Sequence, residues 1–327
     1  MKLLLYDYKD NEERVYFQKM SKEYGIEMET CENGINMDTV KLAEGFDAVS
    51  FNVSDINASI LEALYKEGVR YLSTRSIGVD HIDLKRAGEL GLKVSNVTYS
   101  PNSVADYAVM LILMCARKAR FIMKKSEIQD FTLGGNMGRE LHNLTVGVIG
   151  TGRVGKAVIK NLSGFGCKII AYDIYESDEV HQYAEYKTLD EVFKEADVLT
   201  LHAPATEDNF HMINEDTIEE MKDNVIIVNT ARGALIDTDA MIKGLESGKI
   251  SAAGLDVIEN EFGLYYNDLK SVALKNQELA LLRSFPNVIV TPHMAFYTEQ
   301  ATIDRVDAVM KGLLLSESGK ENPWEII

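Results

Sequence analysis

Polar side chains that suit proton transfer and anion binding follow three apolar runs in the second half of the chain. Arg232 follows Val225–Asn229, acidic residues follow Ala252–Leu255, and His293 follows Val288–Thr291. Runs of this length predict parallel strands, and the carboxyl ends of such strands meet at one edge of a sheet. A histidine can exchange a proton near neutral pH, and an arginine can hold a carboxylate through two hydrogen bonds. The set suits hydride transfer at a carbonyl carbon whose oxygen gains or loses a proton.

Each of these residues also has a structural interpretation. His293 taken alone could be structural or merely exposed, Arg232 could be a surface ion-pair partner, and the acids could be solvated loop charges. Their joint occurrence at consecutive strand ends favours a functional site. Glu259 and Glu261 could each orient His293, because both can face one side of an extended segment, so spacing leaves that choice open.

The elements that must position these side chains centre on residues 145–173, which read as strand, glycine turn, helix and strand. Gly150 permits a tight turn, Gly152 lets the backbone approach a pyrophosphate, and Gly155 lets the helix pack on the strand. The helix start directs N–H groups at phosphates. Asp173 can accept hydrogen bonds from a ribose, whereas a 2′-phosphate about 4 Å away would cost about 4 kcal/mol at an effective dielectric of about 20. The sequence therefore predicts NAD and not NADP.

The rest of the chain predicts an α/β fold of two doubly wound parallel-sheet domains, the larger a Rossmann-type dinucleotide-binding domain. Short apolar runs alternate with helical patterns on both sides of the fingerprint. We expect a substrate domain of residues 1–99 and 299–327 and an NAD-binding domain of residues 100–298. Ser100 and Pro101 predict a helix start, with Ser100 as the N-cap. The helix around 104–116 is apolar on almost every face, which predicts burial between domains or against another subunit, and hence a homodimer.

Composition excludes several partners. The net charge of −17 argues against nucleic acid and against an anionic membrane surface. The three cysteines, Cys31, Cys115 and Cys167, show no metal-like pairing, so we expect no metal site. The opening MKLLLYDYKD predicts a first strand and not a signal peptide, which favours a cytoplasmic enzyme whose substrate is a small molecule.

Several longer segments carry a family resemblance. The chain resembles the NAD-dependent D-2-hydroxyacid dehydrogenases, and within them the D-lactate dehydrogenase branch. The segments that carry this resemblance are Thr74–Asp83, Tyr99–Leu113, Gly150–Gly155, His202–Pro204, Asn229–Thr238, Gly254–Glu261 and Thr291–Thr298.

The resemblance implies a role for each matching residue. Arg232 would bind the substrate carboxylate and carbonyl, His293 would be the general acid/base, and Glu261 would orient His293. The backbone N–H groups of Ile77 and Gly78 and the Tyr99 hydroxyl would complete the carboxylate site as the cleft closes. Besides Gly150, Gly152, Gly155 and Asp173, the residues expected to contact NAD are Arg153, Val154, Ala203, Pro204, Asn209, Thr230, Ala231 and Asp256.

The chain departs from the family pattern at Asn52, where similar D-lactate enzymes often carry a tyrosine that narrows the pocket. Phe296 stands where an aromatic residue is expected in the substrate pocket. We therefore expect reduction of pyruvate, giving D-lactate, or of a branched or aromatic 2-oxoacid. An NAD-sensing binding protein, similar to the dehydrogenase-like corepressors, is the alternative from another class. Surface or structural roles are expected for Arg75 and His81.

Overall fold

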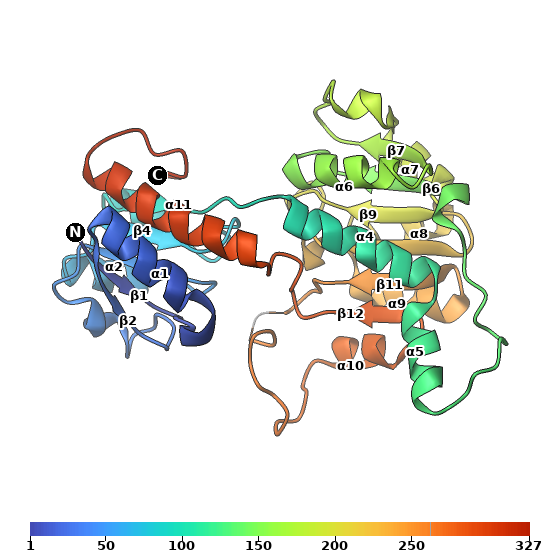
Figure 1. Cartoon of the computed structure of the whole chain (residues 1–327), viewed down its shortest axis with the longest axis horizontal. Coiled ribbons are helices and arrows are strands. Elements are labelled where there is room, and N and C mark those ends of the chain that lie inside the picture. The colour runs from blue at the N-terminus through green and yellow to red at the C-terminus, as the bar shows by residue number, and fades with distance from the viewer. Residues whose placement is uncertain (262) are drawn as a thin grey trace. The chain divides into compact units, whose positions relative to one another are not determined.

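The chain forms two compact units in the computed structural model, which describes residues 1–261 and 263–327, and the side chains of these except residues 10–12. One unit contains Met1–Ser100 and Tyr297–Ile327, and the other contains Pro101–Phe296. We call them the smaller and the larger domain. Each has its own parallel sheet between helices (Figure 1). The fold class predicted from the sequence, two parallel-sheet α/β domains, is confirmed.

The smaller domain has a five-stranded sheet in the order β2-β1-β3-β4-β5, with every pairing parallel. The order reverses between β1 and β3, so the open crevice of this sheet lies beyond their carboxyl ends. The strands are β1 (Lys2–Leu5), β2 (Glu27–Thr30), β3 (Ala48–Phe51), β4 (Tyr71–Thr74) and β5 (Lys93–Ser95).

Helices cover both faces of the smaller sheet. One face carries α1 and α11, which lie side by side (Figure 1), and the other carries α2, α3 and the short η1. The helices are α1 (Asp10–Tyr24), η1 (Val40–Ala43), α2 (Ala58–Lys66), α3 (Leu84–Glu89) and α11 (Glu299–Glu317).

The larger domain has a seven-stranded parallel sheet in the order β12-β11-β10-β9-β6-β7-β8. The order reverses between β6 and β9, and a dinucleotide binds at this kind of reversal. The strands are β6 (Thr145–Ile149), β7 (Lys168–Tyr172), β8 (Glu185–Tyr186), β9 (Val198–Leu201), β10 (Val225–Asn229), β11 (Ile250–Leu255) and β12 (Val288–Val290).

Two apolar cores lie on the two faces of the larger sheet. Helices α4 and α6 pack side by side on one face (Figure 1), and α7, α8, α9 and α10 bury their apolar side chains on the other. These elements, with α5 and the short helices, are α4 (Asn102–Ala116), α5 (Ala119–Glu127), η2 (Leu141–Asn143), α6 (Arg153–Ser163), η3 (Val180–Gln182), α7 (Leu189–Glu195), α8 (Glu215–Glu220), η4 (Gly233–Leu235), α9 (Thr238–Ser247) and α10 (Gln277–Ser284).

Helix α4 differs from its prediction in two ways. It begins at Asn102 with Pro101 as its N-cap, one residue later than the predicted Ser100 cap, and Pro101 itself has helical angles. Its apolar side chains, such as Leu111 and Ile112, are buried in the core of the larger domain itself. A helix that packs on a parallel sheet and against α6 beside it needs no second subunit to explain its burial. Among the described residues, no helix is long and apolar enough to cross a membrane.

Candidate active site

The glycine turn between β6 and α6 has the geometry that the fingerprint predicts. Gly150 has a φ of +92°, and a Cβ there would lie 2.6 Å from the backbone nitrogen of Ala203. A Cβ on Gly155 would collide with the Gly150 carbonyl, so helix and strand make contact there. At Gly152 a Cβ would meet nothing within 4 Å, which leaves open space in front of the start of α6. Arg153 and Val154 are the first two residues of that helix.

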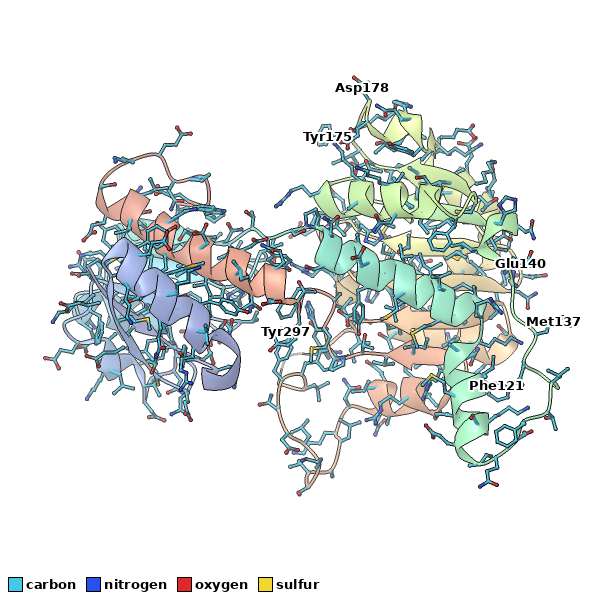
Figure 2. All side chains as sticks on the ribbon, viewed as in Figure 1. Phe121, Met137, Glu140, Tyr175, Asp178 and Tyr297 are labelled. Atoms are coloured by element: carbon cyan, nitrogen blue, oxygen red, sulfur yellow. The ribbon has the colours of Figure 1, made fainter. Side chains whose placement is uncertain are left out.

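Asp173, which follows β7, is held against this turn. Its Oδ2 accepts hydrogen bonds from the backbone N–H of Thr151 at 2.5 Å and from the Thr151 hydroxyl at 3.1 Å, and its Oδ1 accepts one from the N–H of Tyr175 at 3.0 Å. A carboxylate can accept about four hydrogen bonds, so one position remains for a ribose hydroxyl. The neighbouring side chains of Ile174 and Tyr175 are exposed, and Figure 2 shows Tyr175 reaching out from the domain.

Other residues expected to contact NAD surround the same crevice. The Thr230 hydroxyl, just after β10, is buried and has no hydrogen-bond partner among the described residues. After β9, the Asn209 side chain donates to the Pro204 carbonyl at 2.7 Å and so shapes the turn that Ala203 begins. The open space at Gly152 and the unpartnered Thr230 hydroxyl both fit a dinucleotide with polar groups along its length.

His202, at the end of β9, is a structural histidine. Its Nε2 pairs with the Thr200 hydroxyl at 2.9 Å, while its Nδ1 is enclosed without a partner in the described part of the chain. Burial lowers the pKa of the His202 imidazole to about 3, so this ring is neutral near pH 7.

His293 and Glu261 form a close pair. The His293 Nδ1 lies 2.7 Å from the Glu261 Oε1, and both side chains are about 30% exposed (30% and 28%). The Nε2 is the ring nitrogen of His293 that Glu261 does not occupy. The other oxygen of Glu261 accepts the backbone N–H of Ile258 at 3.2 Å, which fixes the carboxylate. Such a carboxylate sets the tautomer and the orientation of the ring.

Asp256 anchors the turn that carries His293. It is fully buried, and its carboxylate accepts hydrogen bonds from the Thr291 hydroxyl at 2.6 Å and from the N–H groups of Met294 and Ala295, each at 2.8 Å. The N–H of His293 donates to the Asp256 carbonyl at 2.8 Å. Because a Thr-Pro-His turn gives no hint of its anchor, the sequence did not predict this role. Contact between Asp256 and the nicotinamide carboxamide stays a prediction.

Two aromatic rings lie beside His293. The ring centroids of Tyr266 and Phe296 lie 6.4 Å and 6.2 Å from that of the imidazole, and the two aromatic rings meet edge to face. The Tyr266 hydroxyl donates to the His293 carbonyl at 2.8 Å, while most of this side chain is exposed. The sequence predicted Phe296 in the substrate pocket but not Tyr266, whose only signal is its place in an aromatic stretch.

Arg232 and Gly233 follow β10 and pack against the segment that carries Glu261. The side chain of Arg232 donates to the Ala231 carbonyl at 2.8 Å. The Asn229 side chain holds this turn, because it accepts the N–H of Ala231 and donates to the Arg232 carbonyl. A Cβ on Gly233 would collide with the Ile258 carbonyl, so the Arg232 turn and the 258–261 segment are in backbone contact.

In the smaller domain, the loop after β4 presents two backbone donors. Within the described residues, the N–H groups of Ile77 and Gly78 make no hydrogen bond, and the Ile77 side chain is 40% exposed. The loop is held by its carbonyls, since the Ser76 hydroxyl donates to the Gly78 carbonyl at 2.7 Å and the Asn96 amide to that of Ile77 at 2.8 Å. Two adjacent donors of this kind suit a carboxylate. Tyr99 is partly buried in the same domain.

The remaining residues singled out in the smaller domain have local partners. Arg75 is buried and donates to the carbonyls of Tyr6 at 2.6 Å and Asp7 at 3.1 Å, which supports its structural interpretation. The His81 Nε2 lies 3.1 Å from the Thr74 hydroxyl. Asn52, which follows β3 at the reversal of the strand order, turns its amide to the Asp7 carbonyl at 3.4 Å.

Known proteins resemble this chain over nearly its whole length. Residues 109–295 match the family model described as "D-isomer specific 2-hydroxyacid dehydrogenase, NAD binding domain". The chain belongs to this family. An aromatic 2-oxoacid reductase of Clostridium sporogenes is 47% identical over 300 residues, which cover 91% of each chain. A D-lactate dehydrogenase of Lactiplantibacillus plantarum is 40% identical over 95% of this chain and 94% of its own.

A solved structure agrees with the fold. A D-2-hydroxyisocaproate dehydrogenase, 35% identical, superposes with a TM-score of 0.91 over 100% of this chain and 99% of its own. The predicted enzyme class, an NAD-dependent D-2-hydroxyacid dehydrogenase, and the predicted cofactor, NAD, are therefore confirmed. In the described ranges, 1–261 and 263–327, no group of three or more His, Cys, Asp or Glu side chains could hold a metal ion.

Proposed function

We propose that this dehydrogenase reduces aromatic and branched 2-oxoacids to (R)-2-hydroxyacids with NADH, in preference to pyruvate. The observation that carries the proposal is the pair of aromatic rings, Tyr266 and Phe296, beside the His293 imidazole. Rings in this arrangement can pack against a substrate ring edge to face, which adds about 1 kcal/mol to the burial of its surface. Asn52 is smaller than the tyrosine of similar D-lactate enzymes, and the 47% identical relative is named an aromatic 2-oxoacid reductase.

The larger domain would supply the acid/base chemistry. The turn at Gly150 and Gly152 and the Asp173 carboxylate would hold NADH, which would supply the hydride for the carbonyl carbon. The Arg232 guanidinium binds the substrate carboxylate and polarises the adjacent carbonyl. The His293 Nε2 donates a proton to the carbonyl oxygen, and the Glu261 carboxylate at Nδ1 holds the ring for this transfer. In the smaller domain, the N–H groups of Ile77 and Gly78 and the Tyr99 hydroxyl bind the carboxylate.

Initial rates with NADH across a panel of 2-oxoacids test the substrate proposal. The panel is pyruvate, 2-oxobutyrate, 2-oxoisocaproate, phenylpyruvate and 2-oxoglutarate. We expect kcat/KM for phenylpyruvate to exceed that for pyruvate by about tenfold or more, which corresponds to about 1.4 kcal/mol. A higher kcat/KM for pyruvate than for phenylpyruvate would overturn the substrate proposal.

Replacement of the histidine tests the mechanism separately. In His293→Ala the proton donor is absent, so turnover with every oxoacid should be lost. NADH should still bind, because the fingerprint turn is untouched, and quenching of NADH fluorescence measures this. Near-normal turnover in the variant would refute the proposed role of His293.

D-Lactate dehydrogenase activity is the second candidate. It is favoured by the relative from Lactiplantibacillus plantarum, which carries that name at 40% identity. The same substrate panel separates the two candidates, because a pyruvate reductase would lose activity as the substrate side chain grows. Either result would also exclude the alternative of an NAD-binding protein without activity.

We also propose a cytoplasmic homodimer. Large apolar side chains stand exposed along one segment, from α5 to the loop before β6, where Figure 2 shows Met137 at the edge of the larger domain. They are Met123, Ile128, Phe131, Leu133 and Met137. A self-complementary contact between two copies would remove this surface from water. Light scattering after gel filtration should give twice 36.5 kDa, and Leu133→Asp should give a monomer.

The free cysteines fit a reducing compartment such as the cytoplasm, and cell fractionation would check this location.

A further inference from the structure

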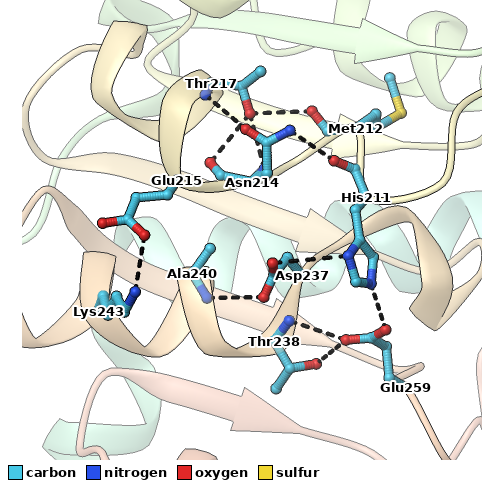
Figure 3. A network of polar contacts seen from close by, with 10 residues as sticks. All are labelled: His211, Met212, Asn214, Glu215, Thr217, Asp237, Thr238, Ala240, Lys243 and Glu259. Carbon is cyan, nitrogen blue, oxygen red and sulfur yellow. Dashed lines mark hydrogen bonds and ion pairs between the residues drawn. The ribbon is translucent and has the colours of Figure 1, made fainter.

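Glu259, two residues before Glu261, is held at three points in the larger domain. Its Oε1 lies 2.6 Å from the His211 Nε2, and its Oε2 accepts the N–H of Thr238 at 3.0 Å and the Thr238 hydroxyl at 2.7 Å. Figure 3 shows the carboxylate between the His211 ring and the start of α9. About four fifths of this side chain is buried, with 19% exposed. Both oxygens of Glu259 are therefore engaged away from His293.

His211 is itself fixed in position. The backbone N–H of His211 donates to the Ala234 carbonyl at 2.9 Å, and the backbone carbonyl of His211 accepts a hydrogen bond from the Asn214 side chain at 3.0 Å. The Phe210 ring stacks on the imidazole at 3.8 Å between centroids. The backbone at His211 is left-handed, with a φ of +52°, which costs energy for a residue other than glycine. Such constraint gives the Glu259 carboxylate a rigid partner.

The anchored segment is short and leads directly to Glu261. Val257 and Ile258 are buried, and Asn260 reverses the chain with a φ of +55°. Glu261 then pairs with His293 at 2.7 Å and accepts the Ile258 N–H. Few degrees of freedom separate the Glu259 anchor from the Glu261 carboxylate.

We propose that Glu259, fixed by His211 and Thr238, is a positioning residue that holds Glu261 against His293. It touches none of the reacting groups and acts through the geometry of Glu261. The proposal rests on the proposed role of Glu261 as the partner of the acid/base. A displacement of about 1 Å at a reacting group can cost about 100-fold in rate. The expected loss of kcat/KM in Glu259→Ala is therefore about 10- to 100-fold.

The test measures kcat, KM, the NADH dissociation constant and the pH profile of oxoacid reduction in four proteins: wild type, Glu259→Ala, Glu261→Gln and the double variant. We expect Glu259→Ala to lower kcat and to move the alkaline decline of the rate to lower pH, as Glu261→Gln does but by less. NADH binding should not change. In the Glu261→Gln background, the additional effect of Glu259→Ala on kcat should disappear, because the two residues act on one geometry.

Two further variants keep the test decisive. His211→Phe retains a ring that can stack on Phe210 and removes the Nε2 partner of Glu259, together with the longer contact of the His211 Nδ1 to Asp237 at 3.7 Å. It should reproduce the shift of the pH profile even if Glu259→Ala folds poorly. Glu215→Gln is the matched control, because the ion pair of Glu215 with Lys243 lies in the same network and is largely exposed (Figure 3). It should leave both kcat and the pH profile unchanged.

The failure of this inference differs from that of the proposed function. If Glu261→Gln leaves kcat and the pH profile unchanged, the pairing of Glu261 with His293 is wrong. If Glu261→Gln changes them but Glu259→Ala and His211→Phe leave the pH profile in place, or if the effects multiply in the double variant, Glu259 has only a structural role. Either of these last two results overturns the inference.

Discussion

Replacement of Asp173 by Asn should relax the choice of NADH over NADPH. The substitution removes one negative charge and keeps the size of the side chain. The Asn oxygen can still accept hydrogen bonds from the N–H and the hydroxyl of Thr151. The backbone N–H of Tyr175 loses its acceptor but can donate to water, because Tyr175 lies at the surface with its side chain 79% exposed. The fold of the turn should therefore survive.

The magnitude follows from the position of the carboxylate. A 2′-phosphate on the ribose would lie about 4 Å from Asp173, where a like-charge pair costs about 4 kcal/mol at an effective dielectric of about 20. Asp173 is only partly buried, so solvent and salt reduce this cost to about 2 kcal/mol. We expect the ratio of kcat/KM for NADPH to that for NADH to rise about 30-fold.

The assay compares both cofactors with one saturating oxoacid, at low and at high salt. The exposed Asp178, five residues further along the same loop, supplies the control Asp178→Asn, which removes the same charge and should leave the ratio unchanged. High salt should weaken discrimination in the wild type and have little effect in Asp173→Asn. An unchanged cofactor ratio in Asp173→Asn would refute the charge argument, and an equal rise in Asp178→Asn would assign it to the net field of the protein.

Four other substitutions test other parts of the molecule. Gly152→Ala should fold normally, because its Cβ would meet only open space. It should lose NADH affinity, because the pyrophosphate is expected to approach the backbone there. Gly155→Ala should instead lower the melting temperature, because its Cβ would collide with the Gly150 carbonyl. Asn52→Tyr is expected to narrow the substrate pocket, so kcat/KM should fall about tenfold for phenylpyruvate and stay the same for pyruvate. Equal losses of kcat/KM for the two substrates would contradict this prediction. Burial lowers the pKa of His202 to about 3, so this side chain is neutral in the folded state between pH 3 and 6.5. In the unfolded state its pKa is about 6.5, so below that pH the unfolded state binds more protons than the folded state. The free energy of unfolding should therefore fall between pH 6.5 and 3, and less so in His202→Phe; equal acid sensitivity would exclude this cause.

The sequence predicted the sheet strands that are buried and missed those that are not. Strands such as β9 and β10 are wholly buried and appear as apolar runs. Strand β2, with the sequence EMET, is mostly exposed at the edge of its sheet, and β8 has only two residues at the edge of the other. Neither carries an apolar run, because an edge strand needs only its backbone to pair. Sequence periodicity detects strands that bury side chains, and neither β2 nor β8 has a fully buried side chain.

The candidate site was predictable as a set of residues at strand ends but not as a geometry. Parallel strands bring their carboxyl ends to one edge whatever the loops do, which is why Arg232 and His293 could be grouped from sequence. The anchors of those loops could not be found in this way. Asp256 holds the His293 turn through a side chain and two backbone groups that lie 35 to 39 residues further along the chain. Such pairings depend on the folded sheet and leave no local pattern.

The choice between Glu259 and Glu261 shows where spacing alone fails. In an extended segment, residues two apart face the same side, so both acids were equal candidates to pair with His293. The segment is not extended, because Asn260 has a φ of +55°. That one left-handed residue sends Glu259 to His211 and Thr238 and leaves Glu261 at 2.7 Å from His293. Asparagine adopts this conformation more readily than most residues, so the sequence Glu-Asn-Glu held a signal that the two carboxylates diverge. Two acids that spacing makes equivalent are thus separated by one backbone angle, so that one contacts His211 and Thr238 and the other pairs with His293.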